Sequence, residues 1–205
     1  MSFTLEQAIE HLYSSVLHRD ETAPLEERTI IFDDGTITKK WGWVFFYNNE
    51  KYYRTRDPSD AHVGAGPLFF NRDTGEIRQH GSGCNMDAEI YDYEMEIEAD
   101  GKTWCLWLSG EQDRIGTILK LKSLLRIDTP SAQRLVGSLP TAIFHGIRRH
   151  LDWMRRQFDS QGIVSYITLE TEPPECHEFA VPARYEHMSN VYAHHAFHDR
   201  WEPDW

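Results

Sequence analysis

The chain has 205 residues, of which 40% are hydrophobic and 13% aromatic, and its formal net charge at pH 7 is −12. This composition is typical of a folded protein, and the length is sufficient for two domains with a core each. The negative charge disfavours binding to nucleic acid phosphates. No run approaches the roughly 18–20 apolar residues of a membrane-spanning helix. The first residues also lack the pattern of a signal peptide, so we expect a cytoplasmic protein without nucleic acid or membrane partners.

Residues 1–88 predict a helix followed by a meander of antiparallel strands. Thr4 and Gln7 have the spacing of a capping box, and apolar residues from Leu5 to Val16 follow at helical spacing, which predicts a helix over residues 4–19. Asp34–Gly35 separates two β-prone runs, which is a hairpin signal. Further turns then divide the segments KYYRTR, LFFN and EIRQHG.

The strand expected at residues 41–47 is apolar on both faces. One parity holds the aromatic residues Trp41, Trp43, Phe45 and Tyr47, and the other holds Val44 and Phe46. A helix can cover only one face of the sheet. We expect the second domain or the C-terminal tail to cover the other face.

Residues 89–172 predict a second domain that begins with an alternating segment. Asp92, Glu94 and Glu96 share one parity, and apolar residues occupy the other, so a strand here would carry a row of carboxylates on one face. Asp100–Gly101 is a second hairpin signal. From residue 103 the expected order of elements is β-α-α-β-α-β, a small sandwich. The fold class predicted for the whole chain is therefore α+β.

Residues 173–205 form a histidine- and aromatic-rich tail that we expect to pack on the domains. His194 and His198 are four residues apart and could share a metal ion on a helix, but no third ligand or HExxH-like base accompanies them. Surface histidines on a tail helix are the alternative.

No catalytic motif stands out elsewhere. The loop HVGAGP lacks the features of a nucleotide-binding loop, and three widely spaced cysteines support neither a disulfide framework nor a CxxC metal site. We therefore expect no enzymatic activity, no catalytic residue, no bound metal and no cofactor. A metal-dependent hydrolase is kept as a third alternative.

Charge is distributed unevenly along the chain. Residues 89–110 contain six acidic side chains and one basic one, whereas residues 111–172 have a net charge of +2. The predicted partner-binding site consists of carboxylates from the acidic segment and from the preceding loop: Asp57, Asp60, Asp92, Glu94 and Glu96. These side chains would attract a protein with a basic surface. A solvated face flanked by basic neighbours is the alternative interpretation.

Residues 4–88 resemble the immunity protein 35 family. The resemblance rests on an AIEHL helix, the segment WGWVFFYNN, the loop ending in Gly66–Pro67, and the turn Asp73–Gly75, which occur in the order found in that family. Ala65 stands where the family commonly has asparagine. The resemblance implies a small cytoplasmic protein that neutralises a bacterial toxin by direct contact.

Residues 103–170 resemble the C-terminal domain of the bacterial ribosomal stalk protein, whose fold is shared with an adaptor of the Clp protease. The matching residues include Ala132, Leu135, Val136, Pro140 and Gly162. Gln133 replaces the usual lysine, so ribosome binding is not implied. Both resemblances favour binding to other proteins. We expect an immunity protein with a cognate toxin as partner, and the alternative is a chaperone-like or protease-adaptor protein with several clients.

Overall fold

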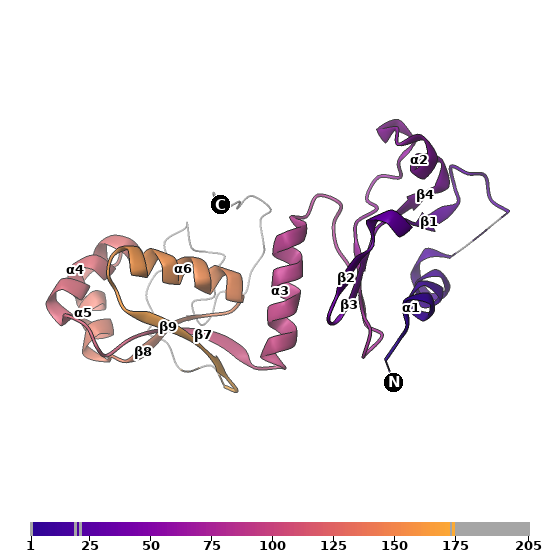
Figure 1. The fold of residues 1–205 in the computed structure, drawn as a ribbon. Helices are drawn as coiled ribbons and strands as arrows, with labels where there is room; N and C mark the ends of the chain where they lie inside the picture. The colour runs from indigo at the N-terminus through magenta and orange to yellow at the C-terminus, as the bar shows by residue number, and fades with distance from the viewer. Residues whose placement is uncertain (1, 19, 21, 173, 175–205) are drawn as a thin grey trace. The chain divides into compact units, whose positions relative to one another are not determined.

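The computed structural model describes residues 2–18, 20, 22–172 and 174. The chain divides into two compact units, Met1–Asn85 and Met86–Trp205 (Figure 1). The fold class is α+β, as predicted. The boundary expected at 88/89 would fall inside the first helix of the second unit. Apart from Pro174, the expected tail at 173–205 lies outside the described residues.

The first unit combines two helices with short strands. Its four-stranded sheet is antiparallel with the order β2-β3-β5-β6, and β1 pairs with β4. The elements are α1 (Leu5–Leu12), the π-helical turn η1 (Tyr13–Leu17), β1 (Thr29–Ile31), the 3₁₀ turn η2 (Asp33–Gly35), β2 (Ile37–Lys39), β3 (Gly42–Phe45), β4 (Tyr47–Asn49), α2 (Glu50–Thr55), the 3₁₀ turn η3 (Pro58–Asp60), β5 (Leu68–Asn71) and β6 (Ile77–Gln79).

An N-terminal helix forms as predicted, but its α-helical part ends at Leu12 and the π-helical turn η1 follows. Thr4 accepts a hydrogen bond from the Gln7 backbone amide, and the Gln7 side chain accepts one from the Thr4 amide, which completes the capping box. The helix then packs on one face of the sheet, where Leu12 joins a buried cluster with Trp43 and Phe70. Burial of these apolar side chains is the main source of stability in this unit.

The other face of the sheet is also apolar, so β3, which contains the middle of the aromatic run at residues 41–47, is buried on both faces. The run does not form a single strand, because Tyr47 begins β4. Val44 and Phe69, which are paired across β3 and β5, are fully buried. The rings of Trp41 and His80 lie 5.5 and 4.2 Å from the Phe69 ring. That the second domain or the tail completes this cover stays a prediction.

The prediction of a hairpin turn at Asp34–Gly35 is wrong. β1 pairs with β4 and β2 with β3, so one long hairpin turns at residues 40–41 instead. In one arm of this hairpin five residues separate β1 from β2, whereas in the other arm a single residue separates β3 from β4. The turn η2 accommodates the extra residues of the first arm. The segment KYYRTR also forms no strand, because Asn49 caps α2 by accepting a hydrogen bond from the Tyr52 amide at 2.7 Å.

The second unit follows the predicted β-α-α-β-α-β order from residue 103. Its antiparallel sheet has the order β8-β7-β9. The core lies between this sheet and α4, α5 and α6, and includes Leu106, Leu121 and Phe158 (Figure 1). The elements are α3 (Met86–Ala99), β7 (Thr103–Leu108), α4 (Arg114–Leu125), α5 (Thr129–Gly137), β8 (Thr141–His145), α6 (Arg148–Ser160) and β9 (Ser165–Glu170).

The prediction of a strand at residues 90–98 is wrong, because this segment lies in the 14-residue helix α3. Ile90 and Tyr93 are buried at helical spacing, and glutamate, methionine and alanine in the segment favour a helix. Asp100–Gly101 does not form a hairpin either. Both residues have positive φ, 47° and 78°, and together they end the helix before β7.

Along the described residues, no helix is both long enough and apolar enough to span a membrane.

Candidate partner-binding site

The five carboxylates of the predicted site lie in both units. In the first unit, Asp57 caps the 3₁₀ turn η3 and Asp60 is its last residue, whereas Asp92, Glu94 and Glu96 belong to α3 of the second unit. The carboxylates therefore fall into two groups, one in each unit.

In α3 the three acidic residues do not form a row. Each residue of an α-helix turns by about 100°, so Asp92 and Glu96 share a side while Glu94 projects from nearly the opposite one. Asp92 and Glu94 are half-buried, and Glu96 is exposed. The single acidic face predicted from the alternating sequence is thus corrected, because the period of the element is 3.6 rather than 2.

Asp92 is held inside the second unit by α6. Arg149 donates from Nε to both carboxylate oxygens of Asp92 at 3.1 Å and from Nη2 to Oδ2 at 2.7 Å. The two side chains are only 15% and 24% exposed, for Arg149 and Asp92 respectively. Burial raises the pKa of Asp92, and the hydrogen bonds from Arg149 oppose that rise. A bidentate pair of this kind fixes the orientation of the two helices.

A second polar link joins the same helices. Tyr91 of α3 donates its hydroxyl hydrogen to Asp152 Oδ2 at 2.6 Å, and Arg148 Nε donates to the same oxygen at 3.0 Å. The Arg148 guanidinium also lies over the Trp104 ring, 4.4 Å from its centroid. Burial, together with the hydrogen bond to Asp152, raises the pKa of Tyr91 to about 12. The acidic helix therefore contacts basic side chains of its own domain.

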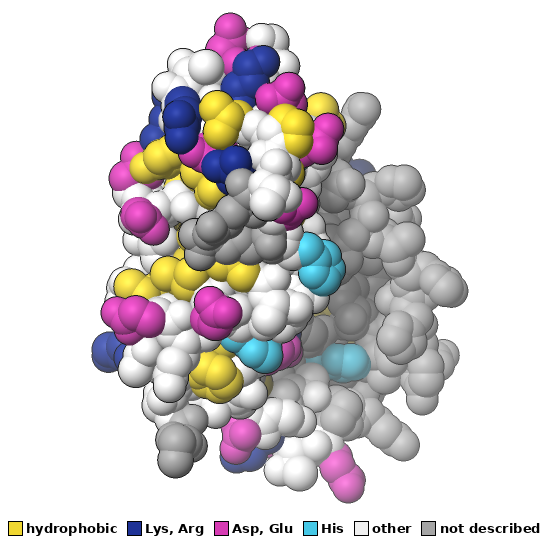
Figure 2. Space-filling view, turned by 90° about the vertical axis from the view of Figure 1, so that its right-hand side faces the viewer, with side chains coloured by type: hydrophobic (Ala, Val, Ile, Leu, Met, Phe, Trp, Pro, Cys, Tyr) yellow, Lys and Arg dark blue, Asp and Glu magenta, His cyan; other side chains and the backbone are white. Residues whose placement is uncertain are grey.

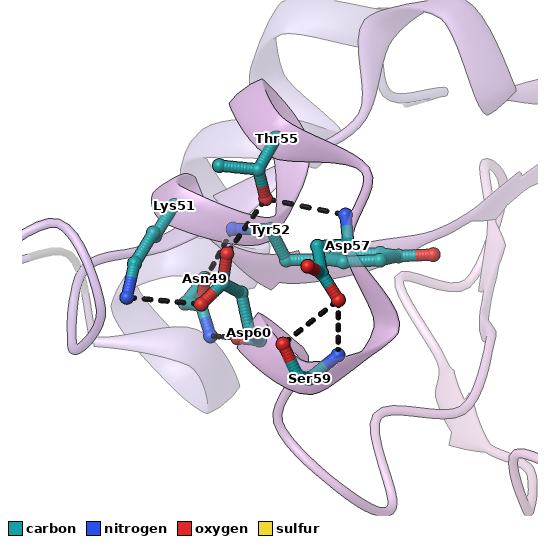
Figure 3. Close-up of polar contacts among 7 residues, drawn as sticks. All are labelled: Asn49, Lys51, Tyr52, Thr55, Asp57, Ser59 and Asp60. Atoms are coloured by element: carbon teal, nitrogen blue, oxygen red, sulfur yellow. Dashed lines mark hydrogen bonds and ion pairs between the residues drawn. The ribbon is translucent and has the colours of Figure 1, made fainter.

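In the first unit, Asp60 is part of a polar network that fixes the turn after α2 (Figure 3). Its carboxylate oxygens contact Lys51 Nζ at 2.9 Å and the Thr55 hydroxyl at 2.8 Å. Hydrogen bonding to Lys51, followed by that to Thr55, lowers the pKa of Asp60. The backbone carbonyl of Asp60 also accepts a hydrogen bond from the Asn49 side chain at 2.6 Å.

Asp57 caps the short turn η3. One of its carboxylate oxygens accepts hydrogen bonds from the Ser59 backbone amide at 2.9 Å and from the Ser59 hydroxyl at 2.8 Å (Figure 3). The backbone hydrogen bond from Ser59 is the main reason that the pKa of Asp57 is lowered. Asp57 is exposed and stays ionised at neutral pH, so it can still face a basic partner.

Two buried asparagines at the end of β4 anchor the loop that follows η3. Asn48 and Asn49 are 6% and 1% exposed. The Asn48 side chain accepts a hydrogen bond from the His62 amide at 2.7 Å and donates one to the His62 carbonyl at 3.2 Å. The sequence by itself predicts only a turn at Asn48–Asn49. Their position between an apolar strand and a helix, where an asparagine commonly caps, was the available signal.

The far end of the loop is fixed by a close backbone approach. A Cβ atom on Gly66 would lie 1.8 Å from the His80 carbonyl oxygen, and the His80 amide donates to the Pro67 carbonyl at 3.0 Å. Between the two anchors, Val63 is fully exposed, with a relative accessibility of 103%. The loop therefore presents one apolar side chain to solvent from a fixed base.

Charges around α2 are mixed rather than uniformly acidic. Figure 2 shows acidic and basic side chains interspersed at the top of the view, where α2 lies. The ion pairs in this region are Arg28–Glu50, Arg54–Glu50, Lys51–Asp60 and Arg56–Asp34. Exposed pairs contribute little to stability and are screened by salt. These pairs involve four basic and three acidic side chains, so this region is not strongly acidic by itself.

The second unit carries an exposed apolar pair on α4. Ile115 and Leu119 are 78% and 67% exposed and are four residues apart, so they lie on one side of the helix. The charged residues of α4 are Arg114, Lys120 and Lys122, which are all basic. This surface, unlike the predicted one, is apolar and locally positive.

The described residues contain no cluster of three or more His, Cys, Asp or Glu side chains suited to hold a metal ion. The histidine pair His194 and His198 lies outside them. Comparisons with models of protein families, with curated proteins and with solved structures find no match to this chain.

Proposed function

We propose that the chain is an immunity protein that binds and neutralises a cognate bacterial toxin by protein contact in the cytoplasm, without catalysis or a cofactor. The proposal rests first on the motifs in residues 4–88 that resemble the immunity protein 35 family. All of these motifs lie within the first unit.

Each of these motifs has a structural role in the same unit. Trp43 lies in the sheet core against α1, Gly66 permits the close approach of His80, and Gly75 has a φ of +73° in the turn between β5 and β6. Residues that are far apart in the sequence thus maintain one sheet and its loops. A sheet that holds its loops in fixed positions is suited to presenting them to a partner.

The observation that carries the proposal is the anchored loop with its exposed valine. A loop of this kind costs little conformational entropy on binding, because both ends are already fixed by hydrogen bonds and backbone packing. Asp57 and Asp60 lie in the same loop region, and a toxin with a basic surface would gain from facing Asp57. Asp92 is no longer proposed as a contact, because Arg149 already occupies it.

The alternative function is a chaperone-like or protease-adaptor protein. It is favoured by the β-α-α-β-α-β order of the second unit and by the exposed pair Ile115 and Leu119 on α4. An exposed apolar pair on a basic helix is suited to binding client proteins through short apolar segments that the clients expose.

Affinity capture with the tagged full chain distinguishes the two functions. An immunity protein should capture one dominant protein, encoded beside its own gene, in roughly equimolar amount. An adaptor should capture a spread of clients with no such neighbour among them. The second result would replace the proposed function by the alternative.

A further inference from the structure

The sheet of the second unit has two faces, and its helices pack on one of them. Residues that are paired across neighbouring antiparallel strands point to the same face of the sheet. Leu106 of β7 is paired with Phe144 of β8 and Ile167 of β9, and all three lie in or against one apolar cluster. Side chains from α3, α4, α5 and α6 belong to the same cluster. The helices therefore cover this face.

The opposite face of the sheet, which we call the outer face, carries the residues of the other parity. Trp107 and Tyr166 stack on it with ring centroids 6.3 Å apart, and Trp107 Nε1 donates to the Thr168 hydroxyl at 2.8 Å. Each described helix of this unit contributes to the cluster on the other side, so the helices do not supply a cover here. The residues of the outer face are Cys105 and Trp107 of β7, Ala142 and His145 of β8, and Tyr166 and Thr168 of β9.

The outer face is nevertheless shielded from solvent at its centre. Cys105 and Ala142 are only 0% and 2% exposed. Ala142 lies on the edge strand β8, whereas the Trp107 ring extends to the other side of β7, where it meets Thr168. Burial also lowers the pKa of His145 on the same face. The outer face thus has a cover that the described helices and strands do not provide.

The chain that follows β9 starts beside this face. β9 is an edge strand of the sheet and ends at Glu170, so residues 173–205 follow it after two residues. A face of three strands, each of five or six residues, is about 20 Å long and about 10 Å wide, which about ten extended residues span. The tail is therefore more than long enough to cover it.

The composition of the tail also suits an apolar face. Segments that remain solvated are poor in aromatic residues, because such residues favour burial. The tail instead holds six of them, so it has the side chains that a face with stacked aromatic rings would bury. These residues are Phe179, Tyr185, Tyr192, Phe197, Trp201 and Trp205.

We propose that the tail, residues 173–205, packs its aromatic side chains on the outer face of the sheet β8-β7-β9. Trp107 and Tyr166 supply the aromatic part of the contact, and the small side chain of Ala142 lets a ring lie directly against the sheet. This inference does not depend on the proposed function. The first unit and a second copy of this chain are the alternative occupants, and the test distinguishes them.

The first experiment locates the tail in the full chain by photo-crosslinking. A photoreactive phenylalanine analogue replaces Phe197 in one variant and Tyr185 in another. After irradiation, peptide mapping should find crosslinks to residues of the outer face, within a single chain. The matched control carries the analogue at Leu119, which is exposed on α4, on the side of the sheet that the helices cover. It should give no crosslink to the tail.

The second experiment measures how far the tail protects Cys105. Cys84 and Cys176 are replaced by serine, so that Cys105 is the only thiol. Replacing the six aromatic residues of the tail by serine should then speed the reaction of Cys105 with a thiol reagent at least about tenfold, because reaction requires an accessible sulfur. The rates are measured well below the thermal midpoint of each variant. The control replaces three polar residues of the same segment by serine and should leave the rate unchanged: His194, His195 and His198.

The outcomes decide between the three occupants. Crosslinks from both tail positions to the outer face, together with the faster thiol reaction, support the inference. Crosslinks to the first unit, to α4 or α5, or between two chains would mean that the tail lies elsewhere, and the inference is then wrong. An unchanged thiol rate in the folded six-serine variant overturns it as well. If that variant does not fold, the crosslinks decide alone, since each of those variants changes a single residue.

Discussion

Arg149 of α6 holds the carboxylate of Asp92 on α3 with three hydrogen bonds across 57 residues of sequence, the shortest at 2.7 Å. The pair lies within one folding unit and is largely shielded from solvent. The most organised acidic feature of the sequence therefore contributes to the interior contacts of a domain.

Removing one member of this pair should destabilise the second unit. Arg149→Ala leaves the Asp92 carboxylate half-buried without its partner, and we expect a loss of about 2–3 kcal/mol in the free energy of unfolding. Arg155→Ala on the same helix is the control, because Arg155 is exposed, and should cost no more than about 0.5 kcal/mol. Urea denaturation measures both. Equal losses for the two variants would show that the pair does not stabilise the domain.

Tyr91 should make stability sensitive to alkaline pH. Its pKa in the folded chain is raised from 10.0 to about 12, so the folded state keeps a proton that the unfolded state releases. The free energy of unfolding should therefore fall as the pH rises from 10 towards 12. Below pH 10 Tyr91 is protonated in both states, so it adds no pH dependence there. Tyr91→Phe should show a shallower fall across that range, as measured by urea midpoints at several pH values. Tyr166→Phe, at an exposed tyrosine, is the control, and identical slopes for all three chains would contradict the assignment.

Asn49 should matter more to the first unit than the ion pair beside it. Asn49→Ala removes the cap of α2 and the hydrogen bond to the Asp60 carbonyl, and we expect a loss of about 2–3 kcal/mol. Lys51→Met removes the exposed pair with Asp60 and should cost no more than about 1 kcal/mol. Faster hydrogen exchange at the Tyr52 amide in Asn49→Ala would locate the effect at the cap. The reverse order of the two losses would mean that the ion pair holds the loop.

Gly66 should tolerate no side chain. A Cβ atom there would lie 1.8 Å from a backbone carbonyl oxygen, which must move to make room. Gly66→Ala should destabilise the first unit by about 3 kcal/mol. At Gly81 no atom lies within 4 Å of an added Cβ, and Gly81→Ala should change the stability by less than about 1 kcal/mol. Thermal unfolding of both variants would test this, and a harmless Gly66→Ala would show that the loop is not anchored there.

Much of the fold could be predicted because local signals and packing agree. The capping box at Thr4 begins α1, and the order β-α-α-β-α-β from residue 103 follows from strand and helix patterns separated by Pro130, Pro140 and Gly162. In these segments, propensity, turn residues and hydrophobic period all indicate the same element.

The failures occur where two periods fit one sequence. In residues 90–98 the acidic residues alternate as in a strand, whereas Ile90 and Tyr93 also fit one side of a helix. Helix propensity and the burial of Ile90 and Tyr93 favour the helix, and Arg149 on the distant helix α6 then pairs with one of its acidic side chains. No local pattern reveals such a partner.

The candidate site was only partly predictable for the same reason. Asp57 and Asp60 were found from their charge, but the anchoring roles of Asn48, Asn49 and Gly66 depend on contacts with other segments. An Asp-Gly pair also does not fix where a hairpin turns. Asp34–Gly35 lies in a 3₁₀ turn within one arm of a longer hairpin and not at the tip of that hairpin.

The central claim is that this chain neutralises one toxin by binding it. The most direct measurement is the growth of a toxin-sensitive host that produces the adjacent gene's product in its cytoplasm, with and without this chain. We predict that co-production of the unchanged chain restores growth and that an unrelated acidic protein at the same level does not. Failure of the unchanged, folded chain to restore growth while the toxin is active would contradict the claim.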